Sequence, residues 1–167
     1  MIHSGVDEIE ASQGKTLVRD VKCGGLETDK FGNLLYIDKS REAILKIKYS
    51  DLKTFVHENV EPPVHPLYTS HTTVTADNLE DLTIEKEYLY WTNSSSDSRF
   101  GTVHKAFTEP FGRGIPLQTF ERYDIGKAQS IATNSKYLLF TGYRSDSIDM
   151  ELFVQNKRGA GYYSSYS

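Results

Sequence analysis

The sequence predicts an all-β fold built from one small sheet that occurs three times. Each copy is a polar turn followed by a run of aliphatic and aromatic residues that ends in a small polar residue, a pattern typical of paired strands. The three runs are residues 34–38, 88–93 and 137–141. Their aromatic residues Tyr36, Tyr90 and Phe140 lie 54 (90 − 36) and 50 (140 − 90) residues apart. A regular spacing of about this size indicates a repeat architecture.

The composition favours strands over helices. Aromatic residues make up 12% of the chain and hydrophobic residues 38%, and aromatic and β-branched side chains prefer strands. At 167 residues, the chain is long enough to bury one substantial hydrophobic core. We therefore expect a single all-β domain.

The first repeat contains three predicted strands at 25–29, 34–38 and 43–47. Gly32 and Asn33 supply the tight reversal between the first two strands, because both residue types tolerate turn conformations. A second polar turn precedes the third strand. The apolar residues of that third strand alternate imperfectly, as expected for a strand that is buried on both faces.

The second and third repeats follow the same plan. Their predicted strands are 81–85, 88–93 and 101–106 in the second repeat, and 129–133, 137–141 and 150–154 in the third. Long polar turns at 93–99 and 143–149 precede the last strand of each repeat. Each repeat therefore supplies three consecutive antiparallel strands.

Three further segments are predicted to form the outer strand of each sheet. They are rich in β-branched and aromatic residues and occupy 16–21, 53–57 and 118–122. The proline-containing segments 61–66 and 109–116 are expected to connect the sheets, because proline removes backbone donors. The chain would then open with an outer strand whose inner strands are missing, so its start resembles a junction.

The repeated sheets predict propeller blades. A small sheet cannot bury its apolar face alone and must stack on similar units, and propellers typically close with about four to eight blades. We expect three four-stranded blades at about 16–60, 61–113 and 114–157, forming half of a six-bladed β-propeller or an open partial propeller. A polar N-terminal arm, 1–15, precedes them, and a flexible tail rich in tyrosine and serine, 158–167, follows.

The second repeat also carries a family resemblance. The run 89–93, Leu-Tyr-Trp-Thr-Asn, followed by the strand at 101–106, resembles the YWTD repeat of low-density-lipoprotein-receptor-type propellers. The first repeat, 25–47, is more similar to NHL and gluconolactonase-like six-bladed propellers. Asn93 stands where the YWTD pattern has aspartate. The resemblance covers residues 16–157 and implies the propeller fold rather than one activity.

Charge and hydropathy argue against nucleic acid and membranes as partners. The 19 basic and 23 acidic residues give a net charge of −4 and are mixed along the chain, so the sequence has no basic stripe for phosphates. No apolar run approaches the roughly 20 residues that span a bilayer, and residues 1–13 lack the pattern of a signal peptide. The compartment stays open, and an organelle lumen or the extracellular space would fit a processed fragment.

Cysteine and glycine residues near the first repeat carry no catalytic signature. Cys23 is the only cysteine, which excludes an intrachain disulfide, and we expect a buried thiol at the start of a strand. Gly24 and Gly25, like the glycines at 112–114, lack the context of a phosphate-binding loop. They are expected to form turns.

The gluconolactonase-like resemblance implies one divalent metal on the propeller axis. Such propellers hold the metal with oxygen ligands from the ends of inner strands, and oxygen ligands suit calcium. The nearest candidates are Glu27, Asp29, Asp81 and Asn134. The five histidines share no spacing typical of a metal site, so calcium is the only metal that we retain as a candidate.

A serine-rich turn at 94–98 offers hydroxyl groups but no nucleophile motif. Asn93, Ser94 and Ser95 form an acceptor sequence for N-glycosylation, which matters only in a secretory lumen. We therefore assign no catalytic residue and no cofactor-binding residue, and we keep Asn93 as a glycosylation candidate.

We expect a non-enzymatic β-propeller module that binds or scaffolds other proteins within a larger assembly. Exposed sheet edges before Thr16 and after Val154 would pair with other protein subunits. Two alternatives stay open, namely a metal-dependent gluconolactonase-like hydrolase and an extracellular YWTD-type ligand-binding domain.

Overall fold

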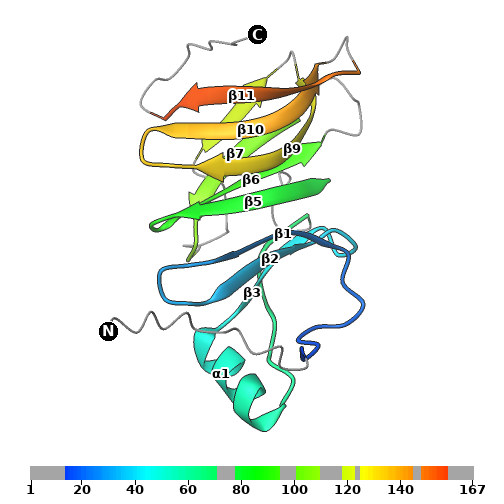
Figure 1. Cartoon of the computed structure of the whole chain (residues 1–167), viewed down its shortest axis with the longest axis vertical. Coiled ribbons are helices and arrows are strands. Elements are labelled where there is room, and N and C mark those ends of the chain that lie inside the picture. Colours follow the sequence, from blue (N-terminus) through cyan, green and yellow to red (C-terminus); the bar gives the residue numbers. More distant parts are fainter. Residues whose placement is uncertain are drawn as a thin grey trace, which may run out of the picture.

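The computed structural model describes residues 14–70, 78–94, 101–109, 118–122, 125–144 and 148–157. Within these ranges the chain forms eleven β-strands and one α-helix, arranged as two antiparallel sheets that do not close into a ring. The helix lies at one end of the long axis and the last strand near the other (Figure 1). The all-β class is thereby confirmed. None of the helical structure in the described ranges is long and apolar enough to cross a membrane.

The first sheet has four strands in sequential order. They are β1 (Cys23–Thr28), β2 (Leu34–Asp38), β3 (Ala43–Ile47) and β4 (His65–Thr69). The Asp29 carboxylate shapes the turn between β1 and β2, because it accepts backbone bonds from Phe31 at 2.9 Å and Asn33 at 3.0 Å. Gly32 adopts a φ of 80° in this turn, a conformation that favours glycine. Every residue of β3 is buried, as its imperfect alternation predicts.

The second sheet has seven strands. They are β5 (Leu79–Glu85), β6 (Tyr88–Ser94), β7 (Gly101–Phe107), β8 (Gln118–Arg122), β9 (Ile125–Thr133), β10 (Tyr137–Arg144) and β11 (Met150–Asn156). Strands β5 to β8 pair in sequence, and so do β9 to β11. Within the described residues, strand pairing joins these two groups at one position, Ser94 with Lys127. The inner strands of all three repeats, and the predicted outer strand β8, are confirmed.

The predicted outer strand at 53–57 is wrong, because these residues belong to the helix α1 (Tyr49–Glu58). Thr54, Phe55 and Val56 suggested a strand, but Phe55 is buried while Val56 is exposed. Leu52 lies one helical turn before Phe55 and packs on the first sheet, which matches helical spacing. Asn59 ends the helix in a left-handed conformation with φ 58° and bonds back to the Phe55 carbonyl.

The predicted outer strand at 16–21 is also wrong, because this segment pairs with neither sheet. Asp20 has a φ of 55°, which interrupts an extended chain. The side chains of Leu17, Val18 and Val21 instead pack on one face of the first sheet. The segment therefore serves as an apolar cover.

The outer strand of the first sheet is β4, which lies partly in the predicted connection at 61–66. Pro66 pairs with Leu45 at a register shift in β3. An edge strand tolerates proline because its outward amide needs no partner, and β4 is at the edge of its sheet. This position explains why a proline-rich sequence could still form a strand.

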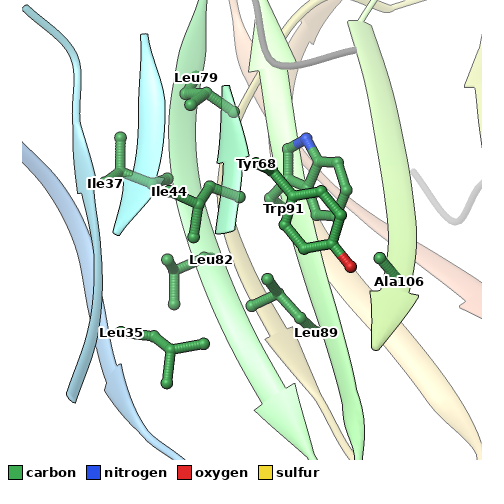
Figure 2. Packing of buried hydrophobic residues seen from close by; sticks show 9 residues of the cluster. All are labelled: Leu35, Ile37, Ile44, Tyr68, Leu79, Leu82, Leu89, Trp91 and Ala106. Atoms are coloured by element: carbon green, nitrogen blue, oxygen red, sulfur yellow. The ribbon is translucent and has the colours of Figure 1, made fainter. Parts of the chain in front are cut away.

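The hydrophobic core joins the three strand groups in series. Leu35, Ile37 and Ile44 of the first sheet point towards Leu82 and Leu89 of the second sheet (Figure 2). The second cluster lies on the opposite face of β6 and packs Tyr90 with residues of β9 to β11. The third cluster lies on the other face of the first sheet and includes the apolar cover and α1. Strands β6 and β7 are thus packed on both of their faces.

The core corrects the alignment of the repeats. Tyr36 and Trp91 each lie on the face of their strand group that points away from the next group along the chain, and Phe140 lies on the face towards the preceding group. Tyr90 lies on the opposite face, where it packs with Phe140. Because side chains alternate along a strand, a shift of one residue reverses the face. Trp91, rather than Tyr90, is therefore the counterpart of Tyr36 and Phe140.

Gly24 and Gly25 lie within β1 and not in a turn, so their predicted role is wrong. A Cβ atom on Gly25 would lie 2.3 Å from Oδ1 of Asp81 and 2.4 Å from the backbone nitrogen of Leu82. Glycine therefore allows β1 to approach β5 closely. Cys23, at the start of β1, is exposed rather than buried.

Candidate functional site

A polar pocket of about 400 Å³ lies where the first strands of the three groups run side by side. Its lining residues come from all three groups, from β1, the turn after β2, β5 and β9. They are Gly24, Lys39, Glu80, Asp81, Gln129 and Ser130. Clefts formed where several elements meet are common ligand sites, and this pocket is the candidate functional site.

Glu80 links β5 to two other elements at the pocket. Its Oε2 atom accepts a hydrogen bond from Nζ of Lys39 at 2.5 Å, which ties the first sheet to β5. Its Oε1 atom accepts a hydrogen bond from Oγ of Ser94 at 2.8 Å. Both side chains of the ion pair are about one quarter exposed, so water reaches them and weakens their mutual attraction.

Asp81 links β5 to β9 across the pocket. Its Oδ2 atom accepts a bond from the Ile131 amide at 3.0 Å, and its Oδ1 atom accepts one from the Leu82 amide at 2.9 Å. The hydroxyl of Thr92 also donates to the backbone carbonyl of Gln129. Strand β5 pairs with β6 and strand β9 pairs with β10, so β5 and β9 do not bond to each other through their backbones. These bonds satisfy the amides of Leu82 and Ile131 and the carbonyl of Gln129.

A repeated polar contact stands at the same place in the second and third groups. The Asp81 amide donates to Oγ1 of Thr92 at 3.2 Å, and the Ser130 amide donates to Oγ1 of Thr141, also at 3.2 Å. The first contact joins β5 to β6, and the second joins β9 to β10. Thr92 and Thr141, near the ends of their aromatic runs, therefore position β5 and β9 along the pocket.

The pocket can offer an ammonium group, carboxylates, an amide and a hydroxyl to a polar ligand. However, the four oxygens of Glu80 and Asp81 already accept protein hydrogen bonds. A general base needs a free basic oxygen within reach of its substrate. The arrangement thus suits hydrogen bonding to a polar group better than proton abstraction.

The four predicted metal ligands do not converge. Asp81 lies in the pocket, but Asp29 follows the far end of β1 and pairs with Nζ of Lys46 at 3.6 Å. Asn134 lies in the turn after β9, where its Oδ1 atom accepts amide bonds. Glu27 lies in β1. Among the residues that the structure describes, no three His, Cys, Asp or Glu side chains are placed to hold one ion.

Asn93, the glycosylation candidate, belongs to a partly buried polar cluster of β6 and β7. Its Oδ1 atom contacts Oγ1 of Thr102 and lies 3.1 Å from Nε2 of His104. The His104 ring also lies 5.2 Å from the ring of Trp91. Burial lowers the pKa of His104 from 6.5 to about 4, because a charged imidazole would lose its hydration there.

Sequence reasoning missed Lys39, Glu80, Gln129 and Ser130. They come from different repeats, so no local motif unites them. One signal was present, because Asp81 and Ser130 occupy equivalent places before the threonines Thr92 and Thr141. Aligning the repeats on those threonines would have brought these residues together.

Comparisons with known proteins relate the fold to solved structures. No protein-family model and no curated protein matches the sequence. The chain is similar to a crystal structure of luciferin-regenerating enzyme, with a TM-score of 0.61 and 15% sequence identity over 84% of this chain. The match covers 47% of that chain, so this sequence spans about half the length of its structural neighbour. At this identity, the likeness concerns the fold alone.

Proposed function

We propose that the chain is a non-enzymatic β-propeller module that binds another protein subunit. In this proposal the strand groups β1–β4, β5–β8 and β9–β11 are successive blades of a partial propeller. The side-by-side course of β1, β5 and β9 supports this arrangement. A further apolar β-sheet, supplied by the partner, would cover the outer face of β9–β11.

The observation that carries the proposal is the exposed apolar face of β9–β11. On one face of this group, Leu138, Phe140 and Phe153 are buried against β6 and β7. Side chains alternate along strands, so the opposite face presents Met150 and Leu152. These side chains are 48% and 58% exposed, although apolar residues normally avoid water.

The corresponding faces of the first two groups are covered. Leu35 and Ile37 of β2 are buried by β5 and β6, and Tyr90 of β6 is buried by β10 and β11. If the third group follows the same pattern, the face that carries Leu152 is covered by a further sheet, and that sheet contributes aromatic and aliphatic side chains. We infer that the partner contributes such a sheet.

The edge of the same group offers a second contact. Strand β11 pairs with β10 and with no other strand in the described part of the chain. Its outer backbone groups can therefore pair with a strand of the partner, since open edges invite strand addition. Face and edge together define the proposed binding surface.

A charge substitution on this surface tests the proposal. Without its partner, the exposed face should drive weak self-association of the isolated chain at high concentration. The double variant Met150→Lys/Leu152→Lys should abolish that association, because burying two ammonium groups is costly. Sedimentation equilibrium measures the effect.

The matched control is Val56→Lys/Val60→Lys, which adds the same charge at two exposed valines on and after α1. It should associate as the unchanged protein does, apart from a small effect of net charge. The proposal fails if both double variants reduce association equally, because the effect would then come from charge alone.

The rival function is a metal-dependent hydrolase with calcium in the polar pocket. The engaged carboxylates of Glu80 and Asp81 speak against it. We expect calorimetric titration with calcium or zinc to give no saturable heat. Saturable binding that disappears in Asp81→Asn would support the hydrolase and displace our proposal.

A further inference from the structure

The junction between the second and third strand groups shows how one group receives the inner strand of the next. The hydroxyl of Thr92 donates to the backbone carbonyl of Gln129 in β9. Oδ2 of Asp81 accepts a bond from the Ile131 amide, also in β9, at 3.0 Å. Two side-chain oxygens of the second group therefore bind a carbonyl and, two residues later, an amide of the strand that lies against them.

The third group carries side chains at the same two positions. The register of β9 on β10 shifts at the place that corresponds to the shift of β5 on β6. Ser130 therefore corresponds to Asp81, and Thr141 corresponds to Thr92. In both groups the amide of the first residue bonds to the threonine hydroxyl at 3.2 Å. The third group thus repeats the polar side of the junction, with a hydroxyl in place of the carboxylate.

These two hydroxyl groups can be reached from solvent. Ser130 is exposed, Thr141 is partly exposed, and the contact between them is exposed. The corresponding contact between Asp81 and Thr92 is partly buried. Among the described residues, no group accepts a hydrogen bond from the Thr141 hydroxyl, although a hydroxyl can donate one bond and accept others. Both oxygens of the third group are therefore available to a further strand.

The two hydroxyl groups adjoin the exposed apolar face of β9–β11. Thr141 of β10 pairs directly with Leu152 of β11, and directly opposed side chains lie on the same face of a sheet. Leu152 is 58% exposed. A strand bound at the two hydroxyl groups would place an apolar side chain over this face, as Ile131 of β9 does when it packs with Tyr90.

We propose that the partner places an extended strand with free backbone groups beside β9. This inference rests on the proposed partner-binding function and names the part of the partner that is recognised. The Thr141 hydroxyl donates to the carbonyl of one residue of that strand, and the Ser130 hydroxyl accepts a bond from the amide two residues later. That second residue is apolar and is not proline, because proline has no amide proton.

A peptide copy of β9 is the probe, because β9 is the strand bound at the covered junction. The peptide spans residues 125–133, has acetylated and amidated ends, and is titrated into the isotope-labelled full chain. We expect saturable shifts of the Ser130 and Thr141 amide signals in NMR spectra. A peptide that is methylated on the nitrogen corresponding to Ile131 should bind about tenfold more weakly, because it lacks the amide proton.

Two variants test the hydroxyl groups themselves. Thr141→Val and Ser130→Ala should each weaken peptide binding about two- to tenfold, the range for one net hydrogen bond. Ser130→Ala changes an exposed side chain, so its urea midpoint should match that of the unchanged protein. The control Thr54→Val removes an exposed hydroxyl on α1 and should leave the affinity unchanged.

Three results would overturn the proposal. The peptide shifts no amide signal, it shifts only signals of β11, or it binds both variants as tightly as the unchanged protein. The partner-binding function is judged separately, by the self-association of Met150→Lys/Leu152→Lys. Loss of association in that double variant, without peptide binding to the unchanged protein, would keep the function and remove only the strand beside β9.

Discussion

Replacing Trp91 by alanine should lower the free energy of unfolding by about 3–5 kcal/mol, the range for a large aromatic residue removed from a core. Trp91 is 0% exposed, and its ring lies 5.3 Å from that of Tyr68 in the first sheet and 5.2 Å from that of His104. The cavity would open between the two sheets, where neighbouring side chains can relax only in part. This loss is a large fraction of the roughly 5–15 kcal/mol that stabilises a typical domain.

Urea denaturation followed by circular dichroism measures this change. Phe31→Ala is the control, because Phe31 is 60% exposed in the turn after β1 and its loss should change stability by no more than about 0.5 kcal/mol. If Trp91→Ala and Phe31→Ala had equal effects, Trp91 could not join the two sheets as described.

Acid should destabilise the protein through His104. Its pKa is about 4 in the folded chain and 6.5 in the unfolded chain, so between these values only the unfolded chain takes up the proton. The loss of stability caused by His104 is therefore absent above pH 6.5 and grows as the pH falls towards 4. The full loss is about 3 kcal/mol, because one pKa unit corresponds to about 1.4 kcal/mol.

The difference between two variants isolates this contribution from that of the carboxylates. His104→Gln should lose about 3 kcal/mol less than the unchanged protein between pH 7 and pH 4, measured by urea denaturation at each pH. His57→Gln, at the exposed end of α1, should follow the unchanged protein. An unaltered pH profile in His104→Gln would contradict the burial of a neutral imidazole.

The inner strands could be predicted from the sequence because their signals are local. Gly32 and Asn33 mark a reversal, and the runs that end at Asp38, Asn93 and Thr141 combine apolar character with a polar stop. Such features depend on a few neighbouring residues. The strands β2, β6 and β10 accordingly lie where the runs predict them.

The helix and the apolar cover could not be predicted in the same way. The segment at 53–57 contains Thr54, Phe55 and Val56, which favour a strand when considered alone. Its helical state depends on Leu52 and Phe55 meeting a sheet face that only the folded chain provides. Tertiary packing overrides propensity at such places.

The candidate site was largely invisible in the sequence for a related reason. Asp81 was identified, but as a metal ligand, whereas it binds the amides of Leu82 and Ile131. Gln129 and Ser130 join it only because β5 and β9 lie side by side. Residues brought together by three separate repeats share no spacing in the chain.

A shift of one residue in the alignment of the repeats changes which faces of the sheets correspond. Matching Tyr90 with Tyr36 places the two supposedly equivalent residues on opposite faces of their strand groups. Matching Trp91 with Tyr36 places them on the same face. With that order, the face that carries Leu152 becomes the counterpart of two covered faces. The proposal of a partner depends on this correction.

The molar mass of the isolated chain, measured by light scattering over a wide concentration range, tests the central proposal most directly. The chain has a mass of 19.0 kDa, and the exposed face and edge of β9–β11 predict a mass that rises above this value with concentration. Added charge at Met150 and Leu152 should return it to the monomer. A constant mass of 19.0 kDa at every concentration, with full sheet content by circular dichroism, would contradict a module that needs a partner.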